Sequence, residues 1–277
     1  LMLGYAKLGA CGLMLILLAG CQSTPDAPLS NNYQGVAPEN RVYDKEEVAK
    51  TRTSLAAQHI KARQLDIAKN QLEMALKADN RYAPAYDMMG VLLQTEGSNA
   101  NLVRAEEFFK KAVALDPNLM QARNNYGVYL SLMGKNQEAV QQFEIAGAAL
   151  GYEGRTRALE NLGVVYLKLG NRDAAKSAFM RAIDANTGSI KARTELIDMY
   201  LQDNNTVLAK QLLGEINAMY GNTPLPPTIL LQSIQIAVAE GNERVKQTQA
   251  QKLLSQYPLS DEAKRLKTWL KNPNQPL

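Results

Sequence analysis

The chain has 277 residues, of which 46% are hydrophobic, 21% charged and only 6% aromatic, and its formal net charge is +4. This length allows one or two domains or an extended repeat array, and the scarcity of aromatic residues disfavours a strand-rich fold. The modest charge, without any run of lysine and arginine, gives no case for a nucleic-acid-binding protein. One histidine and two cysteines exclude a multi-histidine metal centre, a four-cysteine zinc site and a disulfide framework.

Residues 1–20 have the pattern of a signal peptide. Lys7 precedes an apolar run that ends at Gly20, and this run is shorter than the roughly 20 residues that a membrane-spanning helix needs. The sequence LAGC, which ends at Cys21, resembles a bacterial lipobox. The resemblance implies cleavage before Cys21, which would then be the N-terminal residue and carry acyl chains such as palmitate. No other cofactor is expected. An ordinary secretory peptide with a chance cysteine is the alternative.

The residue after the cysteine bears on location. In lipoproteins of this kind an aspartate there retains the protein in the inner membrane, so Gln22 implies sorting to the outer membrane, with the chain anchored on the periplasmic face. Residues 21–44 are polar, contain three prolines and show no apolar period. They are expected to form the lipidated N-terminus and a flexible tether.

The rest of the chain repeats with a period of 34 to 37 residues. Gly90, Gly127 and Gly163 recur at this spacing, and each is followed by a second helix with a large residue on its apolar face, namely Phe109, Phe143 and Phe179. The small residues predict a close approach of two antiparallel helices, with the large ones filling the space toward the next pair. A glycine or asparagine marks the turn within each of the later units, at Gly97, Gly134, Gly170, Asn204 and Gly241.

This pattern is typical of the tetratricopeptide repeat, a helix–turn–helix unit of 34 residues. The predicted fold is an all-α superhelical solenoid of six repeats, which begin near Ala49, Ala83, Met120, Thr156, Ile190 and Pro227. Residues 45–220 would hold repeats one to five, and residues 221–277 a divergent sixth repeat and a capping helix. The apolar stripe of Ala263, Leu266 and Trp269 predicts that last helix.

In such an array the first helix of each repeat lines an inner face, and helical spacing selects the side chains that project into it. The candidate peptide-binding positions are Gln121, Asn124, Asn125 and Val128 in the third repeat and Arg157, Glu160, Asn161 and Val164 in the fourth. Amide side chains can hydrogen-bond a peptide backbone, and valines offer apolar contact. The alternative is that Asn125 and Asn161 only tie neighbouring helices together.

The sequence does not support catalysis or small-molecule chemistry. It contains no nucleophile-elbow, zinc-protease or phosphate-loop motif, and no metal site is expected. Adjacent carboxylates such as Glu106 and Glu107 point apart on a helix and are expected on the surface.

The stretch QARNNYGVYLSLMGKNQEAVQQFEIA, residues 121–146, and the segment NLGVVYLKLGNRDAAKSAFMRAI, residues 161–183, carry a narrower resemblance. With the lipobox, the tether and the repeats, they resemble the PilF/PilW family of type IV pilus biogenesis lipoproteins. The resemblance implies a pilotin, which binds the pilus secretin subunit, brings it to the outer membrane and promotes its multimerisation, and so supports twitching motility.

The sequence also allows two other hypotheses about function. The first is a different outer-membrane lipoprotein of this repeat class, acting as an adaptor for peptidoglycan hydrolases or in barrel assembly. The second is an enzyme or the dedicated subunit of one, for example in the export of envelope polysaccharide.

Overall fold

The computed structural model describes residues 44–273, 275 and 277, and these form helices and no strand. The predicted signal peptide, Cys21, Gln22 and the tether up to residue 43 lie outside the described residues. The helices are α1 (Lys45–Lys61), α2 (Leu65–Ala78), α3 (Ala83–Glu96), α4 (Asn99–Leu115), α5 (Met120–Leu132), α6 (Asn136–Ala148), α7 (Arg155–Lys168), α8 (Arg172–Ala185), α9 (Ile190–Gln202), α10 (Thr206–Tyr220), α11 (Pro227–Ala239), α12 (Glu243–Gln256) and α13 (Asp261–Lys271).

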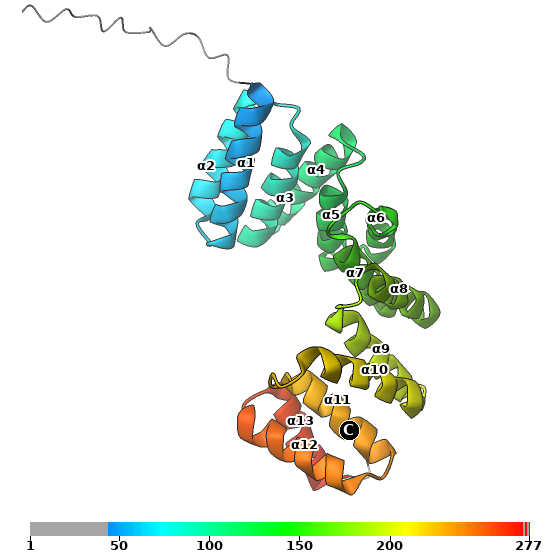
Figure 1. Cartoon of the computed structure of the whole chain (residues 1–277). Coiled ribbons are helices and arrows are strands. Elements are labelled where there is room, and N and C mark those ends of the chain that lie inside the picture. Colours follow the sequence, from blue (N-terminus) through cyan, green and yellow to red (C-terminus); the bar gives the residue numbers. More distant parts are fainter. Residues whose placement is uncertain (1–43, 274, 276) are drawn as a thin grey trace, which may run out of the picture. The chain divides into compact units, whose positions relative to one another are not determined.

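The first twelve helices form six consecutive antiparallel pairs (Figure 1). Each odd-numbered helix from α1 to α11 packs against the next helix, and the second helix of each pair also contacts the first helix of the following pair. First helices contact one another as well, between α1 and α3, α3 and α5, α5 and α7, and α9 and α11. The predicted all-α tetratricopeptide fold is therefore confirmed.

The close approach within a pair depends on glycines in the first helix. A Cβ atom on Gly127 would lie 2.7 Å from the ring of Phe143, and one on Gly163 would lie 2.5 Å from the ring of Phe179. Both rings are buried, so each glycine makes the space that the phenylalanine of its own pair occupies. The predicted close approach of the two helices is confirmed, whereas the prediction placed the large residues toward the next pair and these two rings pack against the glycine of their own pair.

The turns inside the pairs use the left-handed backbone region. Gly134 has φ +76° and Gly170 has φ +73°, and Asn204 has φ +55° at the corresponding place in the fifth pair. Glycine, and to a lesser degree asparagine, adopts this region at low cost. In the first pair, Arg63 has φ +61° in the same role, which the sequence pattern did not mark.

Helix α13 packs on α11 and α12 and covers their apolar side chains. Leu266 is fully buried, and Trp269 is 9% exposed and contacts the cluster that includes Leu230 and Leu253. The indole Nε1 donates a hydrogen bond of 2.8 Å to the carbonyl oxygen of Gln275. The predicted capping helix is therefore present.

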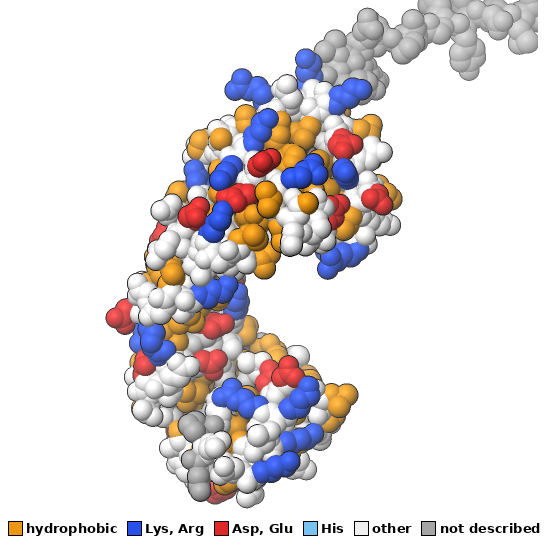
Figure 2. All heavy atoms as spheres, turned by 180° about the vertical axis from the view of Figure 1, so that it is seen from behind, with side chains coloured by type: hydrophobic (Ala, Val, Ile, Leu, Met, Phe, Trp, Pro, Cys, Tyr) orange, Lys and Arg blue, Asp and Glu red, His pale blue; other side chains and the backbone are white. Residues whose placement is uncertain are grey.

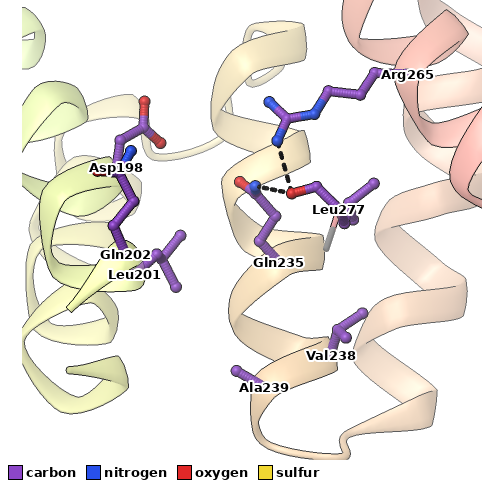
Figure 3. A pocket seen from close by; sticks show the side chains of 8 residues that line it. All are labelled: Asp198, Leu201, Gln202, Gln235, Val238, Ala239, Arg265 and Leu277. Atoms are coloured by element: carbon purple, nitrogen blue, oxygen red, sulfur yellow. Dashed lines mark hydrogen bonds between the residues drawn. The ribbon is translucent and has the colours of Figure 1, made fainter. Parts of the chain in front are cut away.

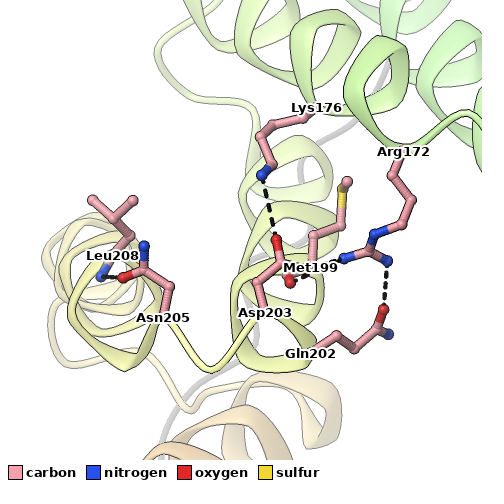
Figure 4. A network of polar contacts seen from close by, with 7 residues as sticks. All are labelled: Arg172, Lys176, Met199, Gln202, Asp203, Asn205 and Leu208. Atoms are coloured by element: carbon pink, nitrogen blue, oxygen red, sulfur yellow. Dashed lines mark hydrogen bonds and ion pairs between the residues drawn. The ribbon is translucent and has the colours of Figure 1, made fainter.

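The junction between the fourth and fifth pairs is polar (Figure 4). Arg172 of α8 donates to the side chains of Gln202 at 2.7 Å and Asp203 at 2.8 Å, and Lys176 lies 3.3 Å from the other Asp203 oxygen. The Arg172 and Lys176 contacts hold the pKa of Asp203 below its usual value, although burial opposes them. Asn205 then begins α10 by accepting the main-chain N–H of Leu208.

On the face shown in Figure 2, acidic and basic side chains are interspersed with apolar ones. Within the described residues, none of the helices is both long and apolar enough to cross a membrane.

Candidate functional site

The third and fourth pairs form a shallow groove with a volume of about 260 Å³, which we call the α5/α7 groove. Helical spacing places side chains four residues apart on one face, so α5 and α7 each contribute a short row. The groove is lined by Val128, Ser131, Leu132, Phe143, Asn161, Val164, Val165 and Lys168. Three of the eight predicted binding residues, Val128, Asn161 and Val164, therefore meet at this place.

The groove combines apolar side chains with one cation. Leu132 is 61% exposed and Val128 is 37% exposed, although both are aliphatic. Lys168 of α7 reaches across to α5 and donates a hydrogen bond of 2.8 Å to the hydroxyl of Ser131. Because this acceptor is neutral, the contact leaves the positive charge of Lys168 uncompensated, and an anion or carbonyl oxygen would be attracted to it.

The predicted amide residues of α5 face the neighbouring pairs. Asn125 Nδ2 lies 3.0 Å and 3.2 Å from the two carboxylate oxygens of Asp87 in α3, and Asn125 Oδ1 accepts from Gln121 at 2.9 Å. Gln121 in turn accepts from the hydroxyl of Tyr152, which precedes α7. These contacts form a polar ladder that joins three successive pairs. Asn125 is therefore hydrogen-bonded to a neighbouring helix, as the alternative interpretation of this residue expected.

The remaining predicted positions divide in the same way. Asn161 donates from α7 to the buried side chain of Asn124 in α5 at 3.3 Å, while it also lines the groove. Glu160 accepts from the hydroxyl of Ser189 at 2.7 Å, which joins α7 to the start of α9. Arg157 is exposed and does not line the α5/α7 groove. Burial raises the pKa of Tyr152, and the charge of Arg157 opposes this rise.

Asp87 supplies the carboxyl group of this ladder, and it is buried. Burial raises the pKa of its carboxyl group from 3.8 to about 7, and the hydrogen bond from Asn125 lowers it only in part. Desolvation disfavours the charged form of a buried carboxyl group. The α3/α5 junction therefore holds a group that titrates near neutral pH, away from the exposed surface of the groove.

Five of the eight lining residues were not among the predicted binding positions, and two of these five, Leu132 and Lys168, carry the exposed apolar surface and the charge of the groove. Leu132 and Lys168 lie one turn beyond Val128 and Val164, in the last turns of α5 and α7. Extending each predicted row by four residues would have found both, because this spacing keeps side chains on one helix face.

The described residues hold no group of three or more histidine, cysteine, aspartate or glutamate side chains that could bind a metal ion. The α5/α7 groove offers exposed aliphatic surface, the ammonium group of Lys168 and the amide group of Asn161. Such groups allow a groove between helices to recognise a polypeptide segment.

Comparison with known proteins agrees with the tetratricopeptide-repeat fold. Tetratricopeptide-repeat family models match residues 108–141 and 156–188. The type IV pilus assembly protein PilF of Pseudomonas aeruginosa is 27% identical over 199 residues, which are 72% of this chain and 74% of PilF. A solved structure of Pseudomonas aeruginosa PilF superimposes with a TM-score of 0.71 and 26% identity, covering 81% of this chain and 98% of that one.

A second solved structure agrees in fold. PilW, described as a widely conserved type IV pilus biogenesis factor, has a TM-score of 0.68 at 24% identity and covers 79% of this chain and 98% of its own. The repeats and the glycine–phenylalanine pairs of the structure agree with these similarities. The chain is a PilF/PilW-like tetratricopeptide-repeat protein.

Proposed function

We propose that the chain acts in type IV pilus biogenesis as an outer-membrane lipoprotein and pilotin. In this role it binds the pilus secretin subunit and promotes the localisation and multimerisation of the secretin. The observation that carries the proposal is the similarity to a type IV pilus assembly protein across 72% of the chain. The lipobox-like sequence that ends at Cys21 supports a lipid anchor, and Gln22 supports the outer membrane as its destination.

The α5/α7 groove is our candidate for the secretin contact. A segment that places an apolar side chain on Leu132 and Val128, with an acceptor toward Lys168, would match its chemistry. Confining both partners to one membrane surface raises their effective concentration and would favour assembly of a ring.

The test compares three variants of the full chain in the bacterium that produces it. Leu132→Asp places a charge in the groove, Cys21→Ala removes the proposed lipid site, and Val207→Asp is the control. Val207 is 78% exposed on α10 and does not line the groove. The readouts are heat-resistant secretin multimers in outer-membrane fractions and twitching motility.

We expect Leu132→Asp to reach the outer membrane but to lose most secretin multimers, because desolvating a carboxylate against an apolar segment weakens binding by about tenfold or more. Cys21→Ala should leave the protein folded but shift the secretin multimers away from the outer membrane. Val207→Asp should behave like the parent. Parent levels of multimers and motility in both Leu132→Asp and Cys21→Ala would overturn the proposal.

A further inference from the structure

A second and larger cavity lies at the C-terminal end of the array, between α9, α11 and α13 (Figure 3). Its volume is about 400 Å³, within the range of about 300–1,000 Å³ that is usual for ligand pockets. It is lined by Asp198, Leu201, Gln202, Gln235, Val238, Ala239, Arg265 and Leu277. We call it the α9/α11 groove.

One wall of this groove already holds a piece of polypeptide. The carbonyl oxygen of Leu277 accepts hydrogen bonds from Gln235 Nε2 at 2.7 Å and from an Arg265 guanidinium nitrogen at 2.6 Å (Figure 3). Leu277 is half-buried, and its side chain packs on the apolar cluster of the last repeat. Because Leu277 forms part of the lining, the cavity is space that remains beside it.

The opposite wall presents an acceptor. Asp198 of α9 is half-buried and accepts from Gln232 Nε2 at 2.8 Å. Burial raises the pKa of Asp198, against the lowering effects of Gln232 and of the Arg265 charge. The donors therefore lie on the α11 and α13 side and a carboxylate on the α9 side, and the lining also includes the aliphatic side chains of Leu201 and Val238 (Figure 3).

An extended peptide can match both walls, because each edge of its backbone presents carbonyl acceptors as well as N–H donors. One edge can therefore place an acceptor toward Gln235 and Arg265, and the other a donor toward Asp198. An arginine guanidinium group in particular makes strong hydrogen bonds to oxygen acceptors. A small ligand with one functional group would satisfy only one wall. The contacts of Leu277 show that a main-chain carbonyl oxygen with an aliphatic side chain fits the donor side.

We propose that the α9/α11 groove is a second peptide-binding site. It takes an extended segment that places an aliphatic side chain between α9 and α11 and a main-chain oxygen within hydrogen-bonding distance of Gln235 and Arg265. Leu277 is its internal competitor for these two donors. The site is distinct from the α5/α7 groove, and its test requires no secretin.

The test uses the full chain and a fluorescent, C-terminally amidated peptide with the sequence KNPNQPL, which copies residues 271–277. Leu277→Gly weakens the internal competitor, and fluorescence anisotropy measures peptide affinity. We expect at least about fivefold tighter binding to Leu277→Gly than to the parent, because the apparent affinity rises with the fraction of open sites.

Two further variants are made in the Leu277→Gly background. Arg265→Glu should weaken peptide binding by about tenfold or more, because it replaces a donor by a repelling carboxylate. Lys267→Glu is the matched control, since Lys267 lies on the same helix but donates to the Pro258 carbonyl outside the groove, and it should leave binding unchanged. A peptide that ends in aspartate in place of leucine should bind more weakly.

Absence of peptide binding to Leu277→Gly would overturn the proposal, and so would binding that Arg265→Glu leaves intact. Equal affinity for the parent and for Leu277→Gly would also overturn it, because Leu277 would then not compete with the peptide. The folding control is independent of the peptide. The far-UV circular dichroism of each variant should match that of the parent.

Discussion

At the scale of single residues, Asp87 shows how burial favours the neutral form of a carboxyl group. It lies at the junction of α3 and α5, where Asn125 supplies its hydrogen bonds and burial raises its pKa to about 7. In the unfolded chain the pKa is close to the ordinary value of 3.8. The native state therefore holds a proton that the unfolded state has lost between about pH 4 and pH 7.

The sign of the pH effect follows from this difference. The contribution of Asp87 to stability is greatest below about pH 4, falls as pH rises toward about 7, and then stays constant. Asp87→Asn removes this titration and keeps an oxygen that can accept from Asn125. We expect the variant and the parent to differ little near pH 4, and the variant to be more stable at pH 8, by on the order of a few kcal/mol.

Urea denaturation at pH 4, 6 and 8 measures this difference. Comparing the variant with the parent at each pH cancels the contributions of all other titrating groups. A variant that is less stable than the parent at pH 8 would show that the native site favours the charged form of Asp87, contrary to the effect of its burial.

At the scale of elements, the space between paired helices is set by one glycine and one ring. Gly163→Ala places a methyl group 2.5 Å from the buried ring of Phe179. Alanine favours a helix over glycine by about 1 kcal/mol, but overpacking a core costs about 1–3 kcal/mol. We therefore expect Gly163→Ala to destabilise the protein in chemical denaturation, and Phe179→Leu to restore part of the loss.

Gly214→Ala is the matched control for this substitution. Gly214 lies within α10, and a Cβ atom there would meet no other atom within 4 Å. Only the helix propensity changes at this position, so we expect a gain of about 0.5–1 kcal/mol in the free energy of unfolding. If Gly163→Ala gave the same gain, the ring of Phe179 would not limit the approach of α7 and α8.

Four of the six expected repeat starts coincide with the first residue of a helix, and the repeat expected near Thr156 begins one residue earlier, at Arg155. The predicted starts at Ala83, Met120, Ile190 and Pro227 are the first residues of α3, α5, α9 and α11. The first helix begins at Lys45, earlier than the expected start of the first repeat at Ala49. At this start the side chain of Asp44 accepts the main-chain N–H of Glu46, a local cap that the repeat period does not predict.

The candidate site was only partly predictable, because a helix period identifies a face but not what lies opposite it. Val128 and Val164 could be assigned to the groove from their spacing. The partner of Asn125, Asp87, belongs to the preceding pair, so whether that amide binds a ligand or a neighbouring helix depends on how the pairs stack. The role of Leu277 depends on contacts with α11 and α13 that no repeat pattern contains.

At the scale of the whole repeat array, stability should be local, because each helix pair contacts mainly its neighbours. The apolar residues form separate clusters. The largest extends from Ala49 to Met199, and another joins Leu230 to Trp269 at the capping helix. Damage to one end should therefore open that end without unfolding the rest.

Trp269→Ala tests this locality, because it removes the largest side chain of the C-terminal cluster. Truncating a buried tryptophan costs about 3–5 kcal/mol, and the cost should fall on α11, α12 and α13. Hydrogen exchange followed by mass spectrometry should show faster exchange in these helices and unchanged exchange from α3 to α8. Leu270→Ala is the control, since Leu270 is 49% exposed on the same helix and should change exchange little. Equal acceleration in all helices would instead mean that the six pairs unfold as one cooperative unit, contrary to the separate apolar clusters of the array.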